Sequence, residues 1–361
     1  MLVQCTKKLF DELKIKPIAA TNEESLFSWH ANIITVNRRK TVVLVNDSNR
    51  YIIVLHGMKA KDFKNFNELI IHSIRETLLA ECIQAEIVEQ FIQHSPELIY
   101  AKTRDRTTVA RMNKACETVY FYADELQSDT INQSRINRKV GTYLVSDDSH
   151  GFMYPYESLY KDLAVFANTA IIACQAVELK IMLSLSNHRV WRHVIVPWHI
   201  TFHELHKVLQ ISFNWKDYHL HDFFIFDGDE PILNLVCSED AFEYPNTVPM
   251  KLETGSKLSD YIPKYSRIKY NYDFGDDWQH YIEVLNMVEN YQYNYPICIG
   301  GEGNAPPEDV GGEGGYDKFL AVIADPKHPE HADMVKWAAM QWYQDFDVTL
   351  VNRRLKDSLR Q

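Results

Sequence analysis

The stretch that decides the fold of the C-terminal half is residues 190–213, which read VWRHVIVPWHITFHELHKVLQISF. The apolar, β-branched run Val190–Val196 predicts a strand. Pro197 ends it, because proline lacks the amide hydrogen that a central strand needs. Thr201 then occupies a helix N-cap position ahead of Phe202–Phe213, in which apolar residues recur every three or four positions. The stretch therefore predicts a strand followed by an amphipathic helix.

Similar strand-like runs flank this stretch on both sides. Val177–Leu185 precedes it and Leu220–Phe226 follows it, and both runs have the length and the apolar residues of a strand. The order strand–strand–helix–strand predicts a β-grasp-like start, in a mixed sheet with helices on one face. Later in the chain, strands are expected at Arg267–Phe274 and Trp278–Met287, and helices at Tyr316–Ala324, Glu330–Gln341 and Val348–Leu359.

The N-terminal half has a different pattern. Three strand-like runs, His30–Val36, Thr41–Val45 and Tyr51–Leu55, are separated by turns rich in Asn, Asp and Ser, which is typical of an antiparallel meander. From about Asp62 the apolar residues recur at helical spacing, and Thr107–Leu126 predicts a further helix. This half is therefore expected to be a small antiparallel meander packed against helices.

The length and composition are those of a two-domain globular protein. The chain has 361 residues, of which 46% are hydrophobic and 24% charged, and these values are ordinary for a folded protein. We predict an α+β protein with one domain at residues 1–145, a linker at 146–176 that contains one short helix, and a second domain at 177–361. The linker is placed where polar clusters interrupt the apolar pattern.

No segment predicts export or a membrane span. No apolar run reaches the ~18–20 residues that cross a bilayer, and the first eight residues lack a signal-peptide pattern. The six cysteines are scattered without a CxxC pair, which argues against a zinc knuckle, a redox motif or a disulfide scaffold. We therefore expect a cytoplasmic protein with no membrane partner.

Charge is distributed unevenly along the chain. Residues 1–170 contain 21 Lys and Arg against 21 Asp and Glu, whereas residues 171–361 contain 17 against 28, a net charge of −11. An acidic surface repels phosphates, so nonspecific nucleic-acid binding is expected only in the N-terminal half. Arg38, Arg39 and Lys40, in a predicted hairpin turn, could contact phosphates there, although a solvated turn also explains them.

Several blocks of the C-terminal half form a recognisable pattern. The two most distinctive are residues 272–280, YDFGDDWQH, and residues 306–312, PPEDVGG. With these blocks the chain resembles the plasmid pRiA4b ORF-3-like family over about residues 177–356. The other main blocks that carry the resemblance are residues 190–197, 205–210 and 213–223.

The resemblance implies the fold and a link with plasmids and other mobile elements, but no activity. Two positions depart from the family pattern: Ala305 stands where Cys is usual, and His193 where a second Arg is common. Any chemistry of that thiol is therefore absent here. The N-terminal half resembles a separate uncharacterised domain family, through residues 5–9 and 29–32.

Carboxylates crowd into one predicted turn and one loop of the C-terminal half. At such spacing they could bind a hard cation through oxygen, or raise the pKa of one member so that it acts as a general acid. A plain turn whose side chains bond local backbone amides explains the same residue types. His280 and Asp277 are the candidate catalytic residues. The candidate metal ligands are Asp273, Asp276 and Glu308, and the candidate ligand-binding residues are Asp273, Asp276, Trp278, Glu308, Asp309 and Tyr316.

Four histidines form an alternative metal site. His203 and His206 lie three apart on a predicted helix, and His219 and His221 lie two apart on a predicted strand, so each pair shares a face. Together they could bind zinc or iron, with a carboxylate as a further ligand. The spacing is not that of HExxH, and a half-exposed strand explains the second pair without a metal.

Residues 299–315 are rich in glycine and proline. They do not match a phosphate-binding loop, because no Gly-Lys-Ser/Thr follows and the glutamates among them would repel phosphate. Glycine permits positive φ, so we expect a loop that folds back tightly over the sheet.

Three hypotheses for function remain open at this point. The first is a noncatalytic binding or interaction protein associated with mobile elements, which takes a protein or small-molecule partner in an acidic, aromatic-lined groove of the C-terminal domain. The second is a metal-dependent hydrolase acting on a nucleotide or nucleic acid, with Mg²⁺ or Mn²⁺ on the carboxylates or zinc on the histidines, and His280 as the general base. The third is nucleic-acid binding through the basic turn. A divalent cation is the one cofactor to which the sequence points.

Overall fold

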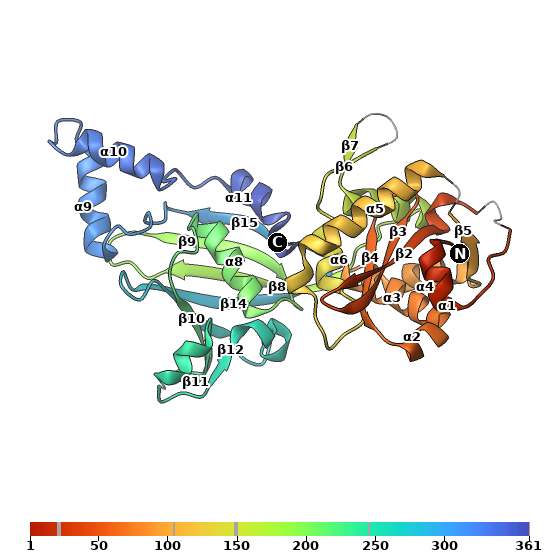
Figure 1. Ribbon diagram of the computed structural model, residues 1–361. Helices are drawn as coiled ribbons and strands as arrows, with labels where there is room; N and C mark the ends of the chain where they lie inside the picture. The colour runs from red at the N-terminus through yellow and green to blue at the C-terminus, as the bar shows by residue number, and fades with distance from the viewer. Residues whose placement is uncertain (20–22, 104, 148–150, 245, 361) are drawn as a thin grey trace. The chain divides into compact units, whose positions relative to one another are not determined.

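The computed structural model contains two compact units (Figure 1). The first comprises residues 1–173 together with Arg360, and the second runs from Cys174 to Leu359. Each unit combines a β-sheet with helices, which confirms the predicted α+β class. Among the described residues, no helix has both the length and the apolarity needed to cross a membrane. The described residues are 1–19, 23–103, 105–147, 151–244 and 246–360.

The N-terminal sheet has the strand order β4-β3-β2-β1-β5. Strands β2 (Ser28–Val36), β3 (Arg39–Asn46) and β4 (Ile52–Met58) form the predicted antiparallel meander. Strand β1 (Leu2–Cys5) pairs in parallel with β2 and with β5 (Ile99–Lys102). The sequence does not indicate β5, because four residues are too few to show a period.

Helices cover both faces of this sheet. On β3, Val42 and Leu44 pack into one core and Val43 and Val45 into another, since side chains alternate along a strand. The first core includes α3 (Phe66–Ala80), α4 (Ala85–His94) and α7 (Pro155–Ala167), and the second includes α5 (Arg106–Phe121) and α6 (Ser134–Val140). The unit also contains two short helices, α1 (Lys7–Leu13) and α2 (Ala60–Lys64), and a two-stranded sheet of β6 (Val145–Ser146) and β7 (Phe152–Met153).

Helix α7 belongs to the first unit, although the sequence places its residues in a linker. Tyr156, Leu159 and Leu163 of this helix are buried in the N-terminal core. The division between the units falls after Ala173. A 13-residue helix with one apolar face packs onto a core rather than remaining in a connection.

The C-terminal sheet has eight strands in the order β12-β11-β10-β13-β14-β8-β9-β15. Neighbouring strands are antiparallel except β11 and β12, which pair in parallel, so the sheet is mixed as predicted. The strands are β8 (Cys174–Leu183), β9 (Val190–Pro197), β10 (His221–Asp227), β11 (Glu230–Val236), β12 (Met250–Leu252), β13 (Arg267–Tyr272), β14 (Trp278–Tyr291) and β15 (Ile297–Glu302).

Helix α8 (Phe202–Phe213) packs across one face of this sheet (Figure 1). Thr201 is its N-cap, as predicted: the hydroxyl accepts from the Glu204 amide, and the Glu204 carboxylate accepts from the Thr201 amide at 2.8 Å. The element order β8–β9–α8–β10 is the predicted strand–strand–helix–strand opening. The same core includes residues of α9 (Gly312–Ala324), α10 (His331–Met340) and α11 (Val348–Leu355).

The glycine-rich segment is not one continuous loop, because β15 extends to Glu302 and α9 begins at Gly312. Glycine is required at Gly303, where φ is +76° and a Cβ would lie 2.2 Å from the Arg189 carbonyl oxygen. The tight packing expected of this segment thus occurs within a strand and its turn.

Candidate functional site

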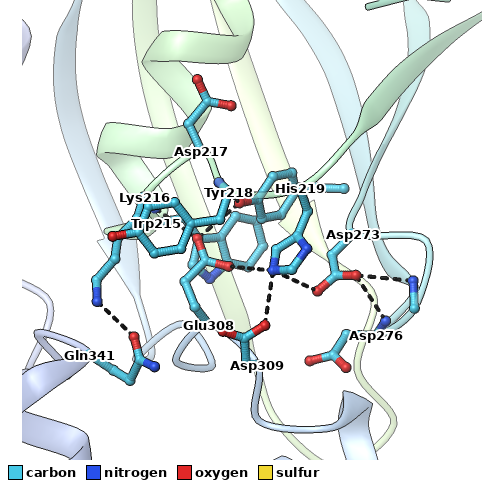
Figure 2. Close-up of polar contacts among 12 residues, drawn as sticks. Trp215, Lys216, Asp217, Tyr218, His219, Asp273, Asp276, Glu308, Asp309 and Gln341 are labelled. Carbon is cyan, nitrogen blue, oxygen red and sulfur yellow. Dashed lines mark hydrogen bonds and ion pairs between the residues drawn. The ribbon is translucent and has the colours of Figure 1, made fainter. Parts of the chain in front are cut away.

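Three segments that are far apart in the sequence bring their polar side chains together beside the C-terminal sheet (Figure 2). His219 lies between α8 and β10, and Asp273 directly follows β13. Glu308 and Asp309 lie in the connection from β15 to α9. We call these four residues the His219 cluster. All three segments lie in blocks that the sequence singled out, at residues 213–223, 272–280 and 306–312.

The imidazole of His219 is the centre of the cluster. Its Nε2 lies 3.0 Å from Asp309 Oδ1, 3.4 Å from Asp273 Oδ2 and 3.8 Å from Glu308 Oε2 (Figure 2). The exposed fractions of the side chains differ: Asp309 is 58% exposed, His219 28%, Asp273 9% and Glu308 1%. The cluster is therefore buried on the side of Glu308 and Asp273 and open to solvent on the side of Asp309.

Asp273 has two functions in this arrangement. Its φ is +54°, and its Oδ1 accepts hydrogen bonds from the amides of Gly275 at 3.0 Å and Asp276 at 3.3 Å. This is the local turn bonding that the residue types alone predict. The turn uses one oxygen only, and Oδ2 faces His219.

Glu308 is the most unusual residue of the cluster. Its Oε1 accepts from the Lys216 amide at 2.7 Å and from the Tyr272 hydroxyl at 2.9 Å. Its Oε2 is buried and has no hydrogen-bond partner among the described residues. Burial raises the pKa of this carboxyl, although the two hydrogen bonds oppose the shift. A buried carboxylate oxygen without a partner is costly, so this atom requires an explanation.

The other acidic and aromatic candidates lie outside the cluster. Asp276 Oδ2 accepts from the Gly311 amide at 3.0 Å, and the Asp277 carboxylate accepts from the Gln279 side chain at 2.9 Å. Trp278 is buried in the core. Tyr316 is also buried, and its hydroxyl donates to the Asn304 carbonyl at 2.9 Å. These four residues support the turn, the loop and the core.

His280 does not face the carboxylates. It is fully buried beside the rings of Phe213 and Trp215, and its Nδ1 lies 3.4 Å from the Tyr270 carbonyl. Burial lowers the pKa of His280 to about 3, so the ring is neutral near pH 7 and a poor proton carrier there. A general-base role for His280 at this cluster has no geometric support.

The four candidate histidines separate into two groups. His219 belongs to the cluster above, because β10 begins only at His221 and the strand alternation does not extend to residue 219. His203, His206 and His221 lie around Glu253 and Asp217, on the neighbouring part of the sheet. We call these five residues the Glu253 network.

Hydrogen bonds close the Glu253 network. Glu253 accepts from His203 at 3.0 Å and from His221 at 2.9 Å. Burial by itself would raise the pKa of Glu253, but these two bonds, together with the charges of His221 and His206, lower the pKa to about 2. His206 bonds to the Tyr270 hydroxyl and to Asp217, both at 2.8 Å. Both nitrogens of this buried ring are thus satisfied.

The Glu253 network is a poor metal site despite its composition. His206, Asp217 and His221 offer ligand atoms within 4.8 Å of one another. However, the rings of His206 and His221 are stacked, with centroids 3.5 Å apart and planes 2° apart. Metal ligands donate in the plane of the ring, and parallel stacked rings cannot both direct a lone pair at one ion. Glu253 and Asp217 carry no motif that would reveal their partners from the sequence.

The basic turn of the N-terminal unit is a hairpin tip. Asn37 and Arg38 have φ of 48° and 62°, the conformation of a two-residue turn that follows the twist of the strands. Lys40 pairs with Glu12 at 2.6 Å, and Arg39 donates to the Ser128 carbonyl at 3.3 Å. Two of the three basic residues therefore have partners within their own unit.

Comparisons with known proteins match both halves of the chain. Residues 175–354 match the family described as plasmid pRiA4b ORF-3-like protein, and residues 2–158 match a domain of unknown function, DUF6933. The uncharacterised protein y4hQ of Sinorhizobium fredii is 32% identical over 191 residues, which are 50% of this chain and 88% of that protein. A crystal structure of a protein of unknown function from Methanosarcina mazei Go1 has 33% identity and a TM-score of 0.41, and covers 48% of this chain and 93% of its own. These names assign no activity. The two family matches confirm both resemblances, and through its C-terminal unit the chain belongs to the plasmid pRiA4b ORF-3-like family.

Proposed function

We propose that the C-terminal unit is a binding module whose His219 cluster holds a divalent cation. The observation that carries this proposal is the buried Oε2 of Glu308, which has no hydrogen-bond partner among the described residues and lies 3.8 Å from His219 Nε2. A cation bound among the four side chains would supply the missing partner of this oxygen.

The ligand atoms of His219, Asp273 and Asp309 lie within 4.8 Å of one another, as a single ion requires. Glu308 is not part of that group, and its Oε2 approaches the group from the side of His219, at 3.8 Å. Ligands at ~2.0–2.1 Å from a tetrahedral metal lie ~3.4 Å from one another. The distances from His219 Nε2 to the three carboxylate oxygens, 3.0, 3.4 and 3.8 Å, bracket this value. One imidazole with carboxylates is a set that Zn²⁺ and Mn²⁺ both accept. The exposed edge at Asp309 leaves room for water or for a ligand group.

The proposal stops at binding. Hydrolysis would need a general base near the ion, and His280, the base that the sequence indicates, lies in the aromatic core. The family description is the one link with a mobile element, and the proposal does not depend on it.

Elemental analysis of the purified full chain, followed by calorimetric titration of EDTA-treated protein with Mn²⁺ and Zn²⁺, tests the proposal. We expect one ion per chain, and at least tenfold weaker binding in Glu308→Gln and in Asp273→Asn. Asp277→Asn is the matched control, because this carboxylate lies four residues from Asp273 and bonds to Gln279 instead. Equal loss in the control, or no saturable binding of either ion by the parent, would contradict the proposal.

The pH dependence gives a second measurement. A carboxylic acid must lose its proton before it binds a cation. Burial raises the pKa of Glu308, so the affinity should fall as the pH is lowered through that raised value, with release of a proton on binding. In Glu308→Gln this part of the pH dependence should disappear.

A further inference from the structure

The face of the C-terminal sheet opposite α8 carries an ordered set of aromatic and basic side chains. On the five strands β10, β13, β14, β8 and β9, one residue of each alternating pair is buried against α8 and the next faces the other way. Cross-strand pairing aligns these outward residues in rows. One row is Phe224, Lys269, Tyr281, Met182 and Trp191, and the next is Phe226, Arg267, Glu283, Lys180 and His193.

The centre of these rows is open to solvent, whereas Phe224 and Trp191 at the two ends of the first row are half-buried. Tyr281 and Met182, at the centre of the first row, are 50% and 47% exposed. Between the rows lies a hollow of about 530 Å³, lined in part by Lys180, Lys269 and Tyr281. Large apolar side chains in the middle of an exposed sheet face usually indicate a surface that binds something.

The charge of this hollow is opposite to that of its unit. Lys180, Arg267 and Lys269 line it, against the single carboxylate of Glu283, whereas residues 171–361 as a whole carry a net charge of −11. Arg267 also pairs with Asp229 at 2.5 Å, but that carboxylate is 92% exposed at a hairpin tip, and such a pair exchanges partners at little cost. The hollow thus favours an anionic occupant.

The aromatic rings are placed to stack with flat groups. Trp191 donates from Nε1 to Glu302 at 2.9 Å, which fixes its ring at one end of the row, and the ammonium of Lys180 lies 5.8 Å from the ring centroid. Five strands at ~4.8 Å spacing span ~19 Å. Sheets of similar width bind single-stranded nucleic acid by stacking two or three bases on aromatic side chains, while basic residues contact the phosphates.

We propose that this sheet face binds a short single-stranded nucleic acid, with bases on Tyr281, Trp191 and Phe224 and phosphates at Lys180, Arg267 and Lys269. Unpaired bases are required, because the bases of a duplex are stacked inside it. The acidic remainder of the unit would repel any strand that extends beyond this face and would confine binding to a few nucleotides. The proposal is independent of the cation site.

Fluorescence polarisation of the full chain with labelled 12-nucleotide oligothymidylate and oligouridylate tests it, with a 12-base-pair duplex for comparison. We expect saturable binding of the single strands, preferred over the duplex. The slope of log K against log salt should be about −2 for three phosphate contacts. Tyr281→Ala should weaken binding about tenfold, and Lys180→Ala with Lys269→Ala should reduce the slope by about 1.4.

Matched controls separate this face from the rest of the surface. Tyr244→Ala removes another tyrosine, 80% exposed, and Lys327→Ala removes another exposed lysine; both should leave binding unchanged. Arg38→Ala with Arg39→Ala should also leave it unchanged. The proposal fails if no oligonucleotide binds at 50 mM salt, if the duplex binds better, or if Tyr281→Ala matches its control. It also fails if the hairpin variant alone abolishes binding, which would locate the contact in the N-terminal unit.

Discussion

The His219 cluster and the Glu253 network have nearly the same composition, but they differ in whether their buried carboxylate has hydrogen-bond partners on both oxygens. Each combines imidazole with carboxylates, and His219 and His221 stand only two residues apart. In the Glu253 network the carboxylate of Glu253 is held by two histidines, and both nitrogens of His206 have partners. In the His219 cluster, one buried oxygen of Glu308 has none among the described residues.

Residue type alone therefore does not distinguish the two groups, whereas the bonding of their buried carboxylates does. A buried polar network with every member satisfied rigidifies a fold. A buried oxygen left without a partner costs stability unless something else supplies the bond. The following variants should therefore affect the two groups in opposite ways.

The largest effect is expected for Glu253→Gln. The amide has one acceptor oxygen where the carboxylate has two, so it loses or reverses the bond to one of His203 and His221 and removes the charge from the other bond. We expect the unit to lose roughly 2–4 kcal/mol. Urea unfolding followed by tryptophan fluorescence measures this, because six of the seven tryptophans lie in the C-terminal unit. A loss of unfolding free energy below about 0.5 kcal/mol would show that the hydrogen bonds of Glu253 do not stabilise the unit.

His280, which belongs to neither group, should make the stability of the C-terminal unit depend on pH in the acid range. The pKa of His280 is lowered by burial to about 3, below the ~6.5 of an unfolded chain. The neutral ring therefore contributes stability that is present above pH 6.5 and is lost as the pH falls towards 3. Between pH 6.5 and pH 4 the loss is on the order of 3 kcal/mol.

In His280→Leu, the unfolding free energy should fall less between pH 6.5 and pH 4 than it does in the parent. Unfolding free energies of the two proteins between pH 4 and pH 7 measure the difference, and Glu253 does not interfere, because its pKa of about 2 affects stability mainly below pH 4.5. Parallel curves for parent and variant would refute the burial argument.

A smaller effect should distinguish the two histidines that lie two residues apart. His221→Gln breaks the bond to Glu253 and the stack on His206, and should cost about 2 kcal/mol. His219→Gln removes a partly exposed ring and should change stability by less than about 0.5 kcal/mol, while cation binding weakens. If both variants were equally destabilised, the comparison between the groups would lose its basis.

Part of this arrangement could be predicted from the sequence. The N-cap at Thr201 and the strands around residues 272–280 follow from local pattern, and the two blocks at 272–280 and 306–312 do meet. Burial of His280 could also have been inferred, because His280 lies two residues from both Trp278 and Ile282 and therefore shares their buried face of β14.

The remainder depends on contacts that no local pattern encodes. Asp217 has φ of +59° and lies in the connection that leads to His219. Strand β10 begins only at His221, so His219 precedes the strand and the expected pairing with His221 does not occur. Glu253 reaches its histidines across 32 and 50 residues from a short 3₁₀ turn, and nothing in its neighbourhood indicates that contact.

Glu308→Gln is expected to change the free energy of unfolding least, and to raise it where the other variants lower it. Burial raises the pKa of this carboxyl, which means that burial costs the ionised form free energy in the absence of a cation, and a neutral amide should keep or raise stability by up to about 1 kcal/mol. Its oxygen can still accept from the Lys216 amide and the Tyr272 hydroxyl. With Mn²⁺ or Zn²⁺ at a hundredfold excess over Kd, the parent should gain about 2.7 kcal/mol and the variant almost none. Thermal unfolding with EDTA and with each metal measures both effects in one experiment. A strongly destabilised variant that still responds to metal would mean that Glu308 belongs to the fold, and the His219 cluster would then be as closed as its neighbour.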